Sequence, residues 1–91
     1  MDKTITIVVT GLVQGVFFRQ GTLEKARQLG ITGFVSNQAD GSVKIVATGD
    51  HEQLDRLVSW CRSGPPRATV TGVDIKEITL EEFRNFSIQR F

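Results

Sequence analysis

The residues that could do chemistry begin with a glycine-punctuated segment, Gly11 to Arg19, that joins a predicted strand to a predicted helix. The first backbone N–H groups of a helix have no acceptors inside it and lie at the positive end of its dipole. Glycines such as Gly15 let the backbone curl around an anion, and the planar guanidinium of Arg19 suits two phosphoryl oxygens. The segment therefore predicts a phosphate-binding loop. By itself, such a segment is more often a plain glycine turn followed by a surface arginine.

Two other potentially reactive side chains are interpreted as structural. His51, the one histidine, falls at the predicted start of a helix and outside that loop, so we interpret it as a solvated side chain. Cys61 completes an apolar helical stripe with Leu54, Leu57 and Val58, which predicts a core residue and not a nucleophile. A single cysteine also excludes an intrachain disulfide and a zinc cluster built on cysteines.

Length and composition predict one domain, residues 1–91, with a modest core. The chain is 40% hydrophobic and 23% charged, which excludes an intrinsically disordered chain. Its net charge of +1 gives no indication of a nucleic-acid or anionic-membrane partner. No apolar run approaches a signal peptide or the ~20 residues of a membrane span, so we expect a cytoplasmic protein.

Hydrophobic periodicity predicts seven elements in the order β-α-β-β-α-β-β. This order is typical of an α+β, ferredoxin-like split βαβ sandwich, an antiparallel sheet with two helices on one face, here with a short C-terminal strand added. An Asp-Gly pair at 40–41 predicts a hairpin turn, and Asp50 with Gln53 predicts a capping box. The expected strands cover residues 5–10, 31–37, 43–48, 68–79 and part of the tail 83–91, and the expected helices cover 19–29 and the segment from Asp50 to the stop at 63–66.

The fold class admits several functions, and the sequence argues against two of them. RNA-recognition domains of this class stack bases on aromatic residues of central strands, and residues 42–48 contain none. A metal chaperone requires paired cysteines. Small enzymes and small-molecule sensor domains remain open.

The segment from Gly11 to Arg19 resembles the first signature of the acylphosphatase family, Gly-x-Val-Gln-Gly-Val-x-Phe-Arg. Residues 33–43, Gly-Phe-Val-Ser-Asn-Gln-Ala-Asp-Gly-Ser-Val, resemble the second signature, in the right order and at the right spacing. Residues 64–68 and 86–88 are also similar to the family, so the resemblance spans nearly the whole chain.

The resemblance implies an enzyme that hydrolyses the carboxyl–phosphate bond of small-molecule acyl phosphates and uses no metal or organic cofactor. The sequence leaves the oligomeric state open, and a monomer is the simplest interpretation of a small compact enzyme. It assigns the catalytic arginine to Arg19 and the catalytic asparagine, which positions the attacking water, to Asn37. Either Phe17 or Phe18 is expected to enter the core and the other to wall the site. The implied phosphate-binding loop consists of the backbone amides of Gly15, Val16, Phe17, Phe18 and Arg19.

Two positions depart from the family pattern, and one alternative function remains. Leu12 and Ser36 stand where the family often has basic or longer polar residues, which bears on substrate affinity and not on the reaction. The alternative is a non-catalytic domain that binds an acyl or carbamoyl phosphate within a larger assembly.

Overall fold

A computed structural model describes residues 1–90, so the last residue of the predicted domain and of the predicted tail strand, Phe91, lies outside the described residues. The predicted order of elements is confirmed. The strands are β1 (Lys3–Leu12), β2 (Thr32–Asn37), β3 (Val43–Gly49), β4 (Thr69–Ile78) and β5 (Phe86–Gln89), and the helices are α1 (Phe18–Leu29) and α2 (His51–Ser63).

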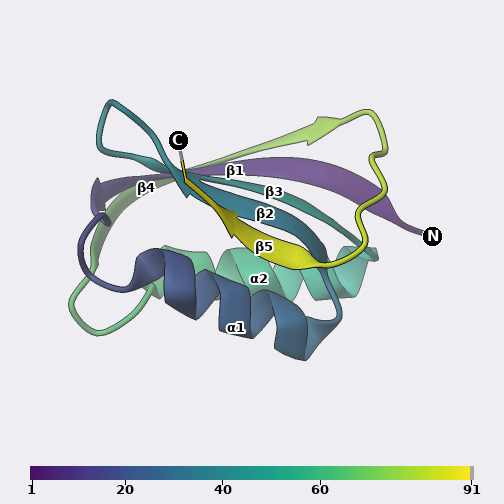
Figure 1. Ribbon diagram of the computed structural model, residues 1–91, viewed down its shortest axis with the longest axis horizontal. Helices are drawn as coiled ribbons and strands as arrows, with labels where there is room; N and C mark the ends of the chain where they lie inside the picture. Colours follow the sequence, from purple (N-terminus) through teal and green to yellow (C-terminus); the bar gives the residue numbers. More distant parts are fainter. Residues whose placement is uncertain (91) are drawn as a thin grey trace.

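The five strands form one sheet in the order β4-β1-β3-β2-β5, and both helices lie on one face of it (Figure 1). The first four strands pair antiparallel as predicted, but β5 pairs parallel with β2, so the expectation of a wholly antiparallel sheet is wrong for this last pair. The cause lies in the direction of β4. Because β4 ends at the edge of the sheet where β2 begins, a short connection enters β5 in the same direction as β2.

The core lies between the sheet and the helices. Alternate residues of β1 (Ile5, Ile7 and Val9) are buried toward the helices, as period-two strand geometry requires. Helix α2 buries the predicted stripe of Leu54, Leu57 and Cys61 against them. The two helices therefore cover the apolar face of the sheet.

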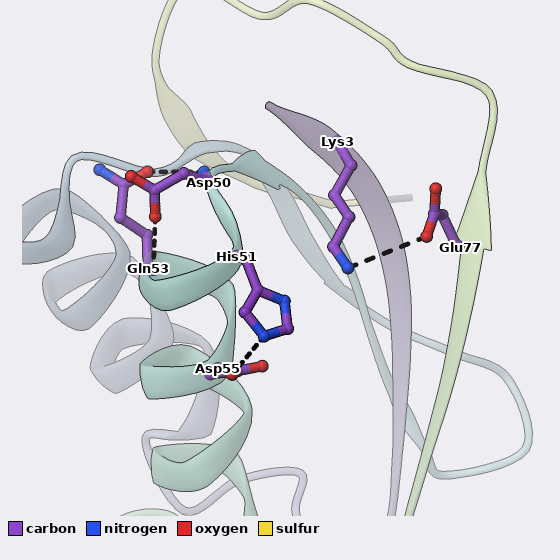
Figure 2. A network of polar contacts seen from close by, with 6 residues as sticks. All are labelled: Lys3, Asp50, His51, Gln53, Asp55 and Glu77. Carbon is purple, nitrogen blue, oxygen red and sulfur yellow. Dashed lines mark hydrogen bonds and ion pairs between the residues drawn. The ribbon is translucent and has the colours of Figure 1, made fainter. Parts of the chain in front are cut away.

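The start of α2 carries the predicted capping box (Figure 2). The backbone N–H of Gln53 donates to the Asp50 carboxylate at 2.8 Å, and the backbone N–H of Asp50 donates to Gln53 Oε1 at 2.8 Å. Gln53 Nε2 also donates to the carbonyl of Leu29 at 2.8 Å. One side chain thus fixes the start of α2 and the end of α1.

The connection from β4 to β5 is anchored by two buried threonines. Thr4 is fully buried, and its Oγ1 lies 2.6 Å from Oγ1 of Thr48. The backbone N–H of Glu81 donates to Thr4 Oγ1 at 2.8 Å, and Thr48 Oγ1 donates to the Glu81 carbonyl at 2.7 Å. This closed network sets the point from which the chain turns into β5.

Thr4→Val should destabilise the fold. The substitution keeps the shape of the side chain but leaves the Glu81 N–H without its acceptor, which we expect to lower the free energy of unfolding by about 1–3 kcal/mol. The Thr48 hydroxyl loses its contact with Thr4 and keeps its bond to the Glu81 carbonyl. Urea unfolding measures the change. The matched control is Thr6→Val on the same strand, whose hydroxyl makes one exposed 3.4 Å contact and whose loss should stay within about 0.5 kcal/mol. Equal effects of the two substitutions would contradict the role given to the network.

Candidate active site

A cavity lies at the edge of the sheet where β1, β2 and β5 all end and α1 begins, at the left of Figure 1. Its volume is about 400 Å³. Arg19, from the first turn of α1, and Asn37, the last residue of β2, both line it. The structure therefore brings together the two side chains that the sequence analysis singled out. From residues 1–90, the lining consists of Val13, Gly15, Phe17, Phe18, Arg19, Gln20, Asn37, Ile88 and Arg90; Val16 does not line the cavity.

In the described part of the chain, the backbone N–H groups between β1 and α1 do not take part in the hydrogen bonds of the sheet or the helix. Gly15 and Phe17 both have left-handed backbone conformations, with φ of 74° and 65°, and the intervening Val16 does not. Alternation of this kind lets successive N–H groups face one concave side, which binds anions. Within residues 1–90, no backbone N–H of residues 15–20 donates a hydrogen bond, and the first helical bond runs from Gly21 N to the Phe17 carbonyl at 3.0 Å.

The two phenylalanines of the loop take opposite positions, as predicted. The Phe18 side chain is 1% exposed and packs on Trp60 with ring centroids 5.3 Å apart, whereas Phe17 is 72% exposed and lines the cavity. The left-handed conformation of a bulky residue such as Phe17 costs about 1–3 kcal/mol. The buried Phe18 next to it, and the bond from Thr22 Oγ1 to the Phe18 carbonyl at 2.8 Å, hold the chain in this shape.

Gln14 fixes the loop to the hairpin that follows β2. Its Nε2 donates to the carbonyls of Gln38 and Ser42 at 2.8 and 2.9 Å. Because Gln38 directly follows Asn37, this clamp sets the loop amides relative to the asparagine. The sequence analysis gave Gln14 no role of its own. The available indication of such a role was that Gln14 is a long polar side chain inside a mostly apolar loop.

Asn37 has an unused acceptor. Its Oδ1 is buried, although the residue as a whole is partly exposed, and it has no hydrogen-bond partner in residues 1–90. A buried carbonyl oxygen without a partner costs about 1–3 kcal/mol, so it favours a ligand or water that can donate to it. The preceding residue, Ser36, is buried and accepts a bond from Gln38 Nε2 at 3.1 Å. Neither Ser36 nor Leu12 lines the cavity, so these departures from the family pattern lie beside the site.

The charged side chains that line the cavity are both cationic. Arg19 and Arg90 contribute guanidinium groups, and among the described residues none that lines the cavity is acidic. Asp40, the acidic residue of the hairpin turn after Asn37, does not line the cavity. Hydrogen bonds from the side chain and the backbone of Ser42 hold the pKa of Asp40 below its usual value, and its Oδ1 lies 2.6 Å from Ser42 Oγ. The cavity is therefore suited to an anion.

His51 and Cys61 lie outside the cavity. His51 is exposed at the start of α2, with Nε2 at 3.1 Å from Asp55 Oδ2, near the end of the sheet where Lys3 pairs with Glu77 (Figure 2). Cys61 is fully buried, and desolvation raises the pKa of its thiol to about 12, which keeps it from acting as a thiolate nucleophile near neutral pH. Residues 1–90 hold no cluster of three metal-ligating side chains of the His, Cys, Asp or Glu type. None of the helices there is long and apolar enough to cross a membrane.

The fold and the cavity define an α+β domain with an anion site made by a helix start, a strand-to-helix loop and strand ends. The family model for acylphosphatases matches residues 5–88. An acylphosphatase of Methylococcus capsulatus is 47% identical over 89 residues, which cover 97% of both chains. An acylphosphatase structure from Coxiella burnetii superimposes with a TM-score of 0.93 at 39% identity, covering 97% of this chain and 93% of that one. One from Bacillus subtilis gives 0.94 at 35% identity, covering 99% and 100%.

The chain belongs to the acylphosphatase family. Its activity is that of an acylphosphatase, a hydrolase that acts on small acyl phosphates.

Proposed function

We propose that the cavity binds the phosphoryl group of an acyl phosphate through Arg19 and the backbone amides of residues 15–19, and that Asn37 positions the attacking water. The observation that carries this proposal is that Arg19, Asn37 and the loop residues Gly15, Phe17 and Phe18 line one cavity of about 400 Å³. Val16 does not line it, and its amide is included because no backbone N–H of residues 15–20 donates a hydrogen bond within residues 1–90. The amides and the guanidinium supply donors to the phosphoryl oxygens, and Asn37 supplies an acceptor for a water proton.

The reaction requires little beyond positioning and charge stabilisation. The oxygen of the water bonds to phosphorus as the bond from phosphorus to the acyl oxygen breaks, and the electron pair of that bond leaves on a carboxylate. A carboxylate is a weak base, with a pKa of about 4 for its acid, so the leaving group needs no general acid. Arg19 and the amides stabilise the charge on the equatorial oxygens during this displacement.

The proton of the water goes to the phosphoryl group itself in this proposal. An amide side chain such as that of Asn37 orients water but cannot accept its proton near neutral pH. Within residues 1–90, the lining contains no carboxylate and no histidine that could act as a general base. The products are a carboxylate and inorganic phosphate, which together hold all atoms of the substrate and the water.

The proposal has the chain act as a cytoplasmic monomer without a nucleic-acid partner. The near-balance of charges in the sequence supports the absence of a nucleic-acid partner. Light scattering of the purified protein checks the monomer. A mass of twice the 10.1 kDa chain would contradict it.

Benzoyl phosphate hydrolysis in the presence of EDTA tests the proposal directly. We expect the wild type to cleave benzoyl phosphate and to leave a phosphate monoester intact. Arg19→Ala should lower kcat/KM about a hundredfold or more because it removes donors from the charged transition state. Arg62→Ala, an exposed arginine on α2, is the matched control and should retain activity. Wild-type protein that folds but does not turn over would favour the non-catalytic binding domain.

Substitution of Asn37 separates binding from turnover in the same assay. Asn37→Ala should lower kcat by about a hundredfold because the water loses its orientation. The inhibition constant of inorganic phosphate should change little, whereas Arg19→Ala should weaken both. Arg19→Lys keeps the charge but not the planar fork, so it should also remain impaired. Asn85→Ala, in the exposed loop before β5, is the control, and near-normal turnover by Asn37→Ala would disprove the role of Asn37.

The rate should depend little on pH. Arginine and asparagine side chains keep one protonation state between about pH 5 and 8, so kcat for benzoyl phosphate should vary by less than about threefold over that range. A steep sigmoid centred near about pH 6.5 would indicate a histidine and contradict the proposed proton acceptor. In that case His51→Gln would identify the group, because His51 is the one histidine of the chain.

A further inference from the structure

Arg90 lines the cavity but belongs to neither of the two family signatures. It follows β5 directly, and it lines the cavity together with Ile88 of that strand. Strands β2 and β5 pair parallel, with Val35 opposite Ile88 and Ser36 opposite Gln89. If that register continues by one residue, Arg90 lies beside Asn37.

Both side chains also face the helices. Successive residues of a strand point to opposite faces of the sheet, so Asn37 shares a face with Val35. Arg90 directly follows β5 and lines the cavity together with Ile88, which is consistent with the same alternation continued by one residue. Val35 is fully buried, and Ile88 packs against the same core. Arg90 and Asn37 therefore project toward the start of α1, where Arg19 lies.

The charges of the cavity call for a ligand with more than one negative charge. Two guanidinium groups line it, and no acidic side chain of residues 1–90 lines it with them. Neither guanidinium belongs to the ion pairs of those residues, which join Lys3 to Glu77, His51 to Asp55 and Arg56 to Glu52. Two nearby cations repel each other in an empty site and attract a dianion such as a phosphoryl group.

The part of the substrate that Arg90 can contact depends on the side of the phosphorus atom on which Arg90 lies. In an in-line displacement the water and the leaving group lie on opposite sides of phosphorus. With Asn37 holding the water, a neighbour of Asn37 lies on the water side, away from the acyl chain. Arg90 is then within reach of the phosphoryl oxygens and not of the acyl group.

We propose that Arg90 is a second phosphoryl-binding residue, whose guanidinium donates to the phosphoryl group from the Asn37 side while Arg19 and the loop amides hold it from the helix start. This inference rests on the proposed function of the same cavity. It also implies that the contribution of Arg90 is independent of the acyl group, since every acyl phosphate presents the same phosphoryl oxygens.

The test compares Arg90→Gln and Arg90→Lys with Arg84→Gln in the otherwise unchanged chain. Arg84 is an exposed arginine that precedes β5, as Arg90 follows it, and it does not line the cavity. For Arg90→Gln we expect the inhibition constant of inorganic phosphate and the KM of the substrate to rise about tenfold, with a smaller change in kcat. The rise in KM should be the same for benzoyl phosphate and acetyl phosphate. Arg90→Lys should fall between Arg90→Gln and the wild type, and Arg84→Gln should match the wild type.

Three results would overturn the inference. Arg90→Gln could behave like Arg84→Gln, it could lower kcat alone with phosphate inhibition unchanged, or it could raise KM for one of the two substrates only. Phosphate binding measured by calorimetry separates this inference from the proposed function. If Arg90→Gln loses phosphate affinity, the inference is supported even where no turnover is measured. If the wild type turns over and Arg90→Gln binds phosphate with full affinity, the inference about Arg90 is refuted while the proposed function stands.

Discussion

The common direction of β1, β2 and β5 is the constraint on which the site depends. Because these three strands run parallel to one another, their carboxyl ends meet at one edge of the sheet. The chain leaves β1 at that edge and enters α1, whose first turn carries Arg19, while β2 ends there on Asn37 and β5 ends next to Arg90 (Figure 1). Residues far apart in the sequence reach one cavity without any long loop, and each is held by an element that is itself part of the core.

The loop between β1 and α1 adds an anion-binding backbone to that edge. Its shape requires a left-handed conformation at Gly15, which glycine adopts at no steric cost, and at Phe17, which does not adopt it freely. The neighbours of Phe17 hold it in place. Phe18 is buried against Trp60, and Gln14 ties the other side of the loop to the hairpin after β2. The strain therefore lies where the amides have to face the cavity, and the supporting contacts lie in the core and in the hairpin.

Much of this arrangement could be predicted from the sequence, because local patterns determine it. Alternating apolar residues identify β1 and β3, and the stripe of Leu54, Leu57 and Cys61 identifies α2. The positions of Arg19 and Asn37 came from family signatures, and the structure places both in one cavity.

What could not be predicted depends on long-range pairing. Nothing in the residues of β5 indicates whether it runs parallel or antiparallel to its neighbour, since that follows from where β4 ends and where the buried Thr4 and Thr48 hold Glu81. The direction of β5 in turn decides whether Arg90 reaches the cavity. The clamp made by Gln14 is equally invisible in the sequence, because its partners are backbone carbonyls of a distant hairpin.

The most direct test of the account is to locate bound phosphate by NMR, using the ¹⁵N-labelled protein titrated with inorganic phosphate. The account predicts that the largest shift changes fall on the backbone amides of residues 15–20, which donate no hydrogen bond within residues 1–90, and on the side-chain amide of Asn37, which lines the cavity with Arg19. Changes centred instead on the opposite face of the sheet, around Lys44 and Lys76, or no change at saturating phosphate, would contradict it.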